Sequence, residues 1–200
     1  MPEIERVGLR MGVDEDFQLI LESRDLQLPE FSVEDLSLSA VHLSPAGAIV
    51  LAGSEAVFME ILGRLFRVSA GSFFQVNTRM AEAMVQHILE KLPDYVSLSR
   101  QSTLMDCYCG VGLFSAFLAS HVGRLIGIEA SPSACDDFVE NLDEFDHVEL
   151  YEAPVEMALP NLNVHPDVIM LDPPRAGLDR RALDAVISLD APVLVYVSCD

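Results

Sequence analysis

From residue 102 onward, short apolar segments with the pattern of buried β-strands alternate with amphipathic segments that have the pattern of helices. The expected strands are 102–107, 124–129, 147–151, 167–171 and 193–198. The expected helices are 112–121, 132–143, 154–159 and 180–188, and a further helix at 78–92 has Asn77 as a good N-cap. This alternation predicts a mostly parallel sheet with helices on both faces, which is a doubly wound α/β domain.

Residues 1–70 have a different character, because their apolar segments are rich in β-branched and aromatic residues and lack a helical period. Segments 7–13 and 17–23, with an acidic turn between them, predict a hairpin. Further strands are expected at 39–44, 46–52 and 57–68. We therefore expect a small β-rich segment at residues 1–70 and the α/β domain at residues 71–200.

The charge of the chain restricts its partners. Its 200 residues include 12 Lys and Arg against 32 Asp and Glu, which gives a formal net charge of −20 at pH 7. Nucleic-acid-binding proteins usually present a basic surface, because neutralising phosphates supplies much of their affinity. The composition thus predicts no general nucleic-acid-binding surface, although Arg175, Arg180 and Arg181 form a local basic cluster suited to a phosphate.

The sequence has none of the marks of a secreted or membrane protein. No apolar run reaches the ~20 residues that cross a bilayer, and the N-terminus lacks the basic and apolar regions of a signal peptide. Cys107, Cys109, Cys135 and Cys199 have neither the paired spacing of a zinc site nor the pattern of a disulfide-stapled domain. We expect a cytoplasmic protein with no metal and no membrane partner.

A glycine turn follows the first strand of the expected α/β domain. In the segment 103–119 an apolar strand leads through Asp106 to Gly110 and Gly112, which open a helix. Glycines at this place let a ligand approach the backbone closely. Glu129 ends the next strand, nineteen residues after Gly110, where a carboxylate can accept hydrogen bonds from both ribose hydroxyls of a cofactor. NAD-binding turns typically have the pattern GxGxxG, and this chain has Ser115 at the position of the third glycine. The turn therefore indicates S-adenosylmethionine as the cofactor and not NAD.

Two further candidate residues end later strands of the same expected sheet. Asp172 follows the strand at 167–171, and Pro173–Pro174 force an extended turn after it. Cys199 follows the strand at 193–198 and becomes a candidate nucleophile if its thiolate is stabilised. Carboxyl ends of parallel strands form one edge, where open α/β sheets bind their ligands.

Five motifs in this order are similar to those of the RNA 5-methyluridine methyltransferases. They are SFFQVN at 72–77, DCYCGVGLFS at 106–115, GIEASPSACDD at 127–137, LDPPRAGLD at 171–179 and VSCD at 197–200. The resemblance implies a Rossmann-like class I methyltransferase domain that transfers a methyl group from S-adenosylmethionine to carbon 5 of a uridine in ribosomal or transfer RNA. It implies that the cofactor is contacted by Gln75, Tyr108, Glu129 and Asp172, and that Cys199 forms a covalent adduct with the base.

The sequence also departs from that family's pattern. Members typically carry a proton-abstracting glutamate and two more strands after the Ser-Cys motif, and neither is found here. The chain therefore resembles a truncated member that binds the cofactor and by itself gives little turnover on RNA. Two alternatives stay open: a non-catalytic or truncated S-adenosylmethionine-binding module, and a methyltransferase of another RNA base. A 5-methylcytosine enzyme commonly has a second cysteine directly after the acid-Pro-Pro turn, where this chain has Arg175.

Overall fold

The computed structural model describes residues 3–29 and 38–198, and the chain divides into two compact units between Phe74 and Gln75. The first unit contains a four-stranded sheet in the order β1-β2-β3-β4. Its strands are β1 (Ile4–Met11), β2 (Phe17–Ser23), β3 (Leu38–Ser44) and β4 (Gly47–Ala52). The expected hairpin is confirmed, because β1 and β2 pair in antiparallel register with Leu9 opposite Leu19. The N-terminal part of the chain is thus β-rich, as its composition predicted.

The prediction of one strand at 57–68 was wrong, because this segment is a hairpin. It consists of β5 (Ala56–Ile61) and β6 (Arg64–Ser69), which pair in antiparallel register. Leu62 and Gly63 form the turn with φ values of 52° and 78°, and a two-residue turn with both φ values positive matches the twist of the flanking strands. Leucine rarely takes this conformation, so the sequence carried no Asn-Gly or Asp-Gly signal for the turn.

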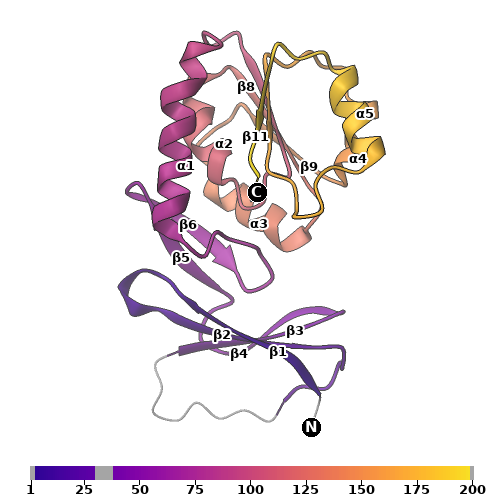
Figure 1. Cartoon of the computed structure of the whole chain (residues 1–200). Helices are drawn as coiled ribbons and strands as arrows, with labels where there is room; N and C mark the ends of the chain where they lie inside the picture. The colour runs from indigo at the N-terminus through magenta and orange to yellow at the C-terminus, as the bar shows by residue number, and fades with distance from the viewer. Residues whose placement is uncertain (1–2, 30–37, 199–200) are drawn as a thin grey trace. The chain divides into compact units, whose positions relative to one another are not determined.

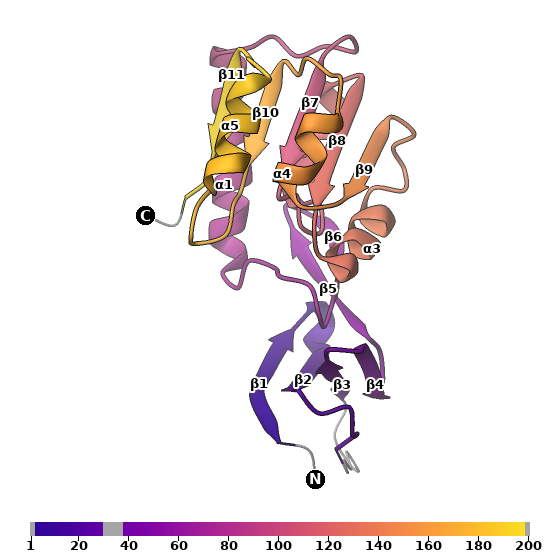
Figure 2. The same ribbon diagram turned by 90° about the vertical axis from the view of Figure 1, so that its right-hand side faces the viewer.

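The second unit is built on a five-stranded parallel sheet. Its strands are β7 (Thr103–Cys107), β8 (Arg124–Glu129), β9 (Val148–Glu152), β10 (Val168–Leu171) and β11 (Val193–Tyr196). Their order is β11-β10-β7-β8-β9, and every neighbouring pair is parallel. The arrowheads of these strands point the same way in Figure 2. All four residues of β10 are buried, as expected of a strand that is covered on both faces.

Helices cover both faces of this sheet. They are α1 (Thr78–Lys91), α2 (Leu113–Leu118), α3 (Pro132–Asn141), α4 (Val155–Ala158) and α5 (Arg180–Ser188). Figures 1 and 2 show α4 and α5 on one face and α1, α2 and α3 on the other. The side chain of Asn77 accepts a hydrogen bond from the Met80 amide at 3.1 Å, which confirms the expected N-cap of α1. The doubly wound α/β architecture is confirmed.

The strand order places a topological switch point between β7 and β10. From β7 the chain proceeds outward through β8 to β9, and it then returns to the other side of β7 to form β10 and β11. In open α/β sheets, ligands bind outside the carboxyl ends of the strands at such a point. Among the described residues, no helix has both the length and the apolar character that a bilayer span requires.

Candidate functional site

The turn between β7 and α2 lies at the carboxyl edge of the sheet, next to the switch point. Its residues Tyr108, Gly110 and Gly112 have φ values of 63°, 54° and 90°. A Cβ atom on Gly112 would lie 2.4 Å from Cδ1 of Leu142, whereas a Cβ on Gly110 would meet nothing within 4 Å. Gly112 is therefore required by packing against its surroundings, and Gly110 leaves open space over the backbone where a ligand can approach.

Tyr108 is the strained residue of this turn. A positive φ is uncommon for a bulky side chain and is a reason to look for a function. The ring is half-buried and packs against the core cluster that includes Cys107 and Ile128. Burial is the main reason that its pKa is raised to about 12, with Glu156 as the largest charged neighbour. The phenol therefore stays protonated at neutral pH and is available as a hydrogen-bond donor and as an apolar surface.

The carboxylate of Glu129 is joined to the glycine turn by hydrogen bonds. Its Oε2 accepts from the amide of Gly110 at 2.9 Å, and its Oε1 accepts from the amides of Ala130 and Ser131, each at 2.8 Å. A carboxylate has about four lone-pair sites, so these three donors leave room for a ligand hydroxyl. The structure thus brings Glu129 and Gly110 together, as their spacing predicted.

Asp172 follows β10 on the other side of β7. Its backbone amide donates to the carbonyl of Cys107 at 3.4 Å, which holds the start of the acid-Pro-Pro turn against the end of β7. Burial raises the pKa of its carboxyl to about 6. An acidic group with a raised pKa at a switch point is a candidate for binding or for proton transfer.

Asp106 is the residue that sequence reasoning missed. It lies in β7 between these two acidic groups, and its exposed fraction is 0%. Ser115 Oγ donates to its Oδ2 at 2.6 Å, and none of the residues that the structure describes forms a hydrogen bond with its Oδ1. Burial is the largest cause of a pKa raised to about 7, and the charges of Asp172 and Glu129 raise it further. The signal in the sequence was a carboxylate inside an otherwise apolar strand.

The end of β11 lies beside the acid-Pro-Pro turn, because the amide of Val197 donates to the carbonyl of Leu171 at 2.8 Å. A hollow of about 250 Å³ opens here between the loop 173–177 and the residues at and just after the end of β11, Tyr196 to Ser198. Cys199, the expected nucleophile, is the next residue and lies outside the described residues.

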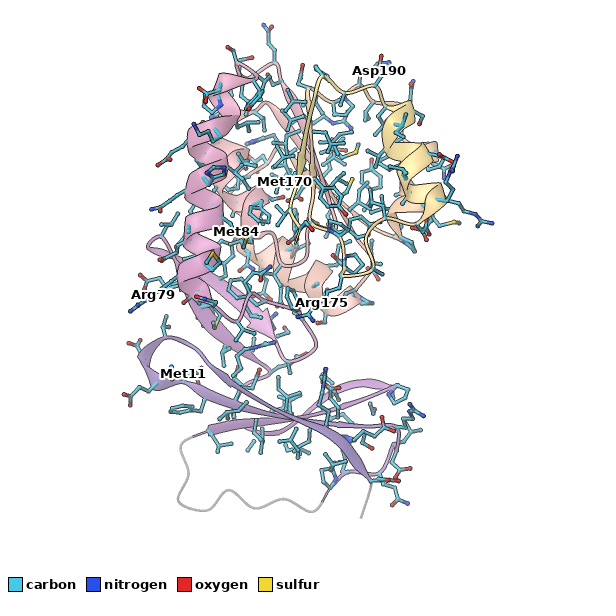
Figure 3. All side chains as sticks on the ribbon, in the orientation of Figure 1. Met11, Arg79, Met84, Met170, Arg175 and Asp190 are labelled. Carbon is cyan, nitrogen blue, oxygen red and sulfur yellow. The ribbon has the colours of Figure 1, made fainter. Side chains whose placement is uncertain are left out.

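The remaining predicted residues lie apart from this cluster or pair elsewhere. Gln75 precedes α1 and is partly buried, and no hydrogen bond among the described residues joins it to the carboxyl edge. Arg180 forms an exposed ion pair with Asp184 at 3.0 Å. Arg175 and Arg181 are exposed, and Figure 3 shows Arg175 on the loop that follows β10. Arg175 on this loop and Arg181 in the first turn of α5 are therefore exposed positive charges.

Three of the four cysteines are buried free thiols: Cys107, Cys109 and Cys135. Burial raises the pKa of each of them. A thiol in such surroundings stays protonated and is a poor nucleophile. These three residues therefore have the character of core side chains.

The parallel sheet with its switch point, the glycine turn and the acidic residue that ends the following strand define a class I methyltransferase fold. The solved structures that share it include two tRNA methyltransferases. The Pyrococcus abyssi tRNA (uracil-54, C5)-methyltransferase in complex with S-adenosyl-L-homocysteine matches with a TM-score of 0.70 and 22% identity, over 97% of this chain and 50% of that one. The Methanocaldococcus jannaschii tRNA m1G37 methyltransferase matches with a TM-score of 0.54 and 16% identity, over 92% of this chain and 55% of that one.

Sequence comparison gives the family. Residues 55–152 match the family model "tRNA (Uracil-5-)-methyltransferase". An uncharacterized RNA methyltransferase of Streptomyces avermitilis is 34% identical over 193 residues, which are 93% of this chain and 43% of that protein. Another, from Thermosynechococcus vestitus, is 38% identical over 152 residues, which are 75% of this chain and 33% of that protein. The chain belongs to the tRNA (uracil-5-)-methyltransferase family of S-adenosylmethionine-dependent RNA methyltransferases, and it spans less than half the length of these two relatives.

Proposed function

We propose that this protein methylates carbon 5 of a uridine in transfer or ribosomal RNA through a covalent adduct with Cys199. The observation that carries the proposal is the grouping at one switch point of the Gly110–Gly112 turn, Glu129, Asp172 and the end of β11, the strand that leads to Cys199. A cofactor and a base bound along this edge would be next to each other. The covalent role of Cys199 rests on the resemblance of VSCD to the family's Ser-Cys motif.

The cofactor site is the first part of the proposal. The residues fit S-adenosylmethionine, because Gly110 leaves open space for its close approach and Glu129 keeps acceptor capacity for ribose hydroxyls. Tyr108, Asp172 and Gln75 are further proposed contacts, and Gly112 sets the shape of the turn. When bound, the cofactor supplies an electrophilic methyl group on a positively charged sulfur.

The nucleophile is the second part. Carbon 5 of uracil is a poor nucleophile, and the thiolate of Cys199 would change this by adding to carbon 6. The new S–C6 bond moves the ring's electrons into an enolate whose carbon 5 is nucleophilic. After carbon 5 has received the methyl group, a general base removes its proton, the S–C6 bond breaks, and the C5–C6 double bond re-forms with the thiolate as leaving group.

Calorimetric titration with S-adenosylmethionine tests the cofactor site. Glu129→Ala is expected to weaken binding by ~1.5–3 kcal/mol, the range for hydrogen bonds to a charged group. Glu90→Ala is the matched control, because Glu90 is an exposed residue of α1. Equal affinities of the two variants would refute the ribose assignment of Glu129.

Trapping with RNA that contains 5-fluorouridine tests the nucleophile separately. Fluorine at carbon 5 prevents the final elimination, so the protein–RNA adduct persists on a denaturing gel and its formation needs no general base. We expect an adduct in the presence of S-adenosylmethionine, its loss in Cys199→Ala, and its retention in Cys135→Ala. An adduct in the Cys199 variant would contradict the assignment.

Turnover is a separate question from trapping. The general base of the reaction has no identified counterpart in residues 1–200, so we expect this chain alone to methylate unmodified RNA poorly. Robust methylation by residues 1–200 would show that one of their own groups removes the proton.

A further inference from the structure

A fully buried carboxyl group lies at the centre of the carboxyl edge and has no role in the function proposed above. Asp106 is in β7, with Gly127 of β8 and Met170 of β10 as its register partners. Ser115 donates its hydroxyl to Oδ2 at 2.6 Å, while Oδ1 has no hydrogen-bond partner among the described residues. Burying a polar atom without a partner costs about 1–3 kcal/mol, so this atom is a reason to look for a function.

The charges around Asp106 all have the same sign. Glu129 faces it from the end of β8 and Asp172 from the turn after β10, and each raises its pKa. On its own strand and in the glycine turn, the neighbours are the buried thiols of Cys107 and Cys109. Among the described residues, no lysine, arginine or histidine contributes to the electrostatics of this carboxyl. An ionised Asp106 would therefore be a buried negative charge without a counter-charge.

A buried carboxyl in such surroundings retains its proton at a higher pH than an exposed one. The pKa of Asp106 is raised to about 7, first by desolvation and then by its acidic neighbours. At neutral pH the free protein therefore holds about half a proton on this residue. Anything that brings positive charge to the edge would favour the ionised form.

S-adenosylmethionine brings such a charge, because the sulfonium and ammonium groups of its methionyl end outweigh its single carboxylate. Its proposed place is over the Gly110–Gly112 turn, which starts four residues after Asp106 and opens onto free space at Gly110. We propose that Asp106 is a cofactor-positioning residue, whose buried carboxyl releases its proton to solvent when S-adenosylmethionine binds and then balances the positive charge of the methionyl end. This inference rests on the cofactor site proposed above. No covalent bond forms or breaks apart from the O–H bond of the carboxyl.

Titration calorimetry in two buffers of different ionisation enthalpy, phosphate and Tris, measures the protons released per cofactor bound. At pH 7.0 we expect the wild-type chain to release about 0.5 proton, the protonated fraction of a group with a pKa of about 7. Between pH 6.0 and 7.5 its affinity should rise about eightfold, as the ionised fraction rises. The cofactor's own amino group, with a pKa of about 7.7–8.0, already titrates in part at pH 7.5. Its contribution is the same for a variant that lacks the Asp106 carboxyl, so the comparison with that variant removes it.

Asp106→Asn is the test variant, because its amide oxygen can still accept the hydrogen bond from Ser115. We expect this variant to bind S-adenosylmethionine without releasing the 0.5 proton. Its affinity should not show the eightfold rise between pH 6.0 and 7.5. Asp172→Asn is the comparison variant, because Asp172 directly follows the neighbouring strand β10. Asp172 is itself a proposed cofactor contact, so the comparison uses the number of protons released per cofactor bound and not the affinity. With a pKa of about 6, Asp172 holds only about one-tenth of a proton at pH 7.0, so this variant should release more protons than Asp106→Asn.

The outcomes separate this inference from the cofactor site itself. If the wild-type chain does not bind S-adenosylmethionine, the proposed site is wrong. If the wild-type chain binds with equal heats in the two buffers, the site stands and the role of Asp106 is refuted. Loss of proton release in Asp172→Asn but not in Asp106→Asn would assign the proton to Asp172 instead. If Asp106→Asn does not fold, the wild-type measurement and the variant Ser115→Ala test the proposal instead. Loss of the Ser115 hydroxyl should raise the pKa of Asp106 and thus the number of protons released at pH 7.0. A number of released protons equal to the wild-type value would refute the proposal.

Discussion

The burial of Asp106 makes a quantitative prediction about the stability of the cofactor-free protein. The pKa of this carboxyl is 3.8 in an unperturbed chain and about 7 in the folded one. Because the folded state therefore binds more protons between these values, wild-type stability falls as the pH rises through this window. The asparagine of Asp106→Asn does not titrate in this range and still has an acceptor for the Ser115 hydroxyl. The stability of this variant should therefore not fall as the pH rises through this window. Integrating the titrations of Asp106 in the unfolded and the folded state gives the advantage of the variant. Its free energy of unfolding should exceed that of the wild-type chain by about 2 kcal/mol at pH 5.5 and about 4 kcal/mol at pH 8.0.

Urea denaturation of the wild-type chain and Asp106→Asn, followed by circular dichroism at these two pH values, measures the difference directly. The variant should be more stable at both, and its advantage should grow by about 2 kcal/mol from pH 5.5 to 8.0. Asp184→Asn is the control, because Asp184 is an exposed partner of Arg180 on α5. Parallel pH dependences of the wild-type chain and Asp106→Asn would mean that Asp106 is already ionised in the folded state.

Three further predictions follow from the packing and the charge. Gly112→Ala should lower the free energy of unfolding by ~1–3 kcal/mol, because its Cβ would lie 2.4 Å from Leu142 Cδ1 at a positive φ; a stability equal to that of Gly110→Ala in denaturation would contradict the packing argument. Charge reversal of Arg175 and Arg181 should weaken RNA binding and reduce the slope of log affinity against log salt concentration by about 2. Filter binding at several salt concentrations measures this slope, and an unchanged slope would contradict a role of these arginines in RNA binding. A net charge of −20 should make added NaCl raise the melting temperature through screening, and a melting temperature that falls between low and physiological salt would oppose this.

The fold of the second unit could be predicted well because its strands are buried on both faces. Such strands read as short apolar runs, and Val168–Leu171 has no exposed residue to obscure the pattern. The place of Glu129 beside Gly110 also followed from the sequence, since adjacent parallel strands end at one edge and their register is nearly fixed. In both cases local pattern and global topology impose the same answer.

The parts that could not be predicted depend on contacts between distant residues or on unusual backbone geometry. The Leu62–Gly63 turn needs a leucine at positive φ, which its hairpin partners enforce and its own preference opposes. For Asp106, the sequence shows a carboxylate inside an otherwise apolar strand but does not show its surroundings. Its special character arises because Ser115 folds back onto it and because strands on both sides bury it, and neither is written in the local sequence.

Glu129 at the end of β8 and Asp106 in β7 show that two carboxyl groups near one edge of a sheet can be stabilised in different ways. Glu129 is partly exposed and accepts three backbone amide hydrogens, so its negative charge is balanced by the protein's own dipoles. Asp106 has Ser115 as its hydrogen-bond donor, lies out of contact with water, and is surrounded by acidic neighbours. The first is a fixed acceptor for the neutral hydroxyls of a ribose. The second, on our proposal, releases its remaining proton at neutral pH when a positive group arrives, which makes the pH dependence of cofactor affinity a property of this one buried side chain.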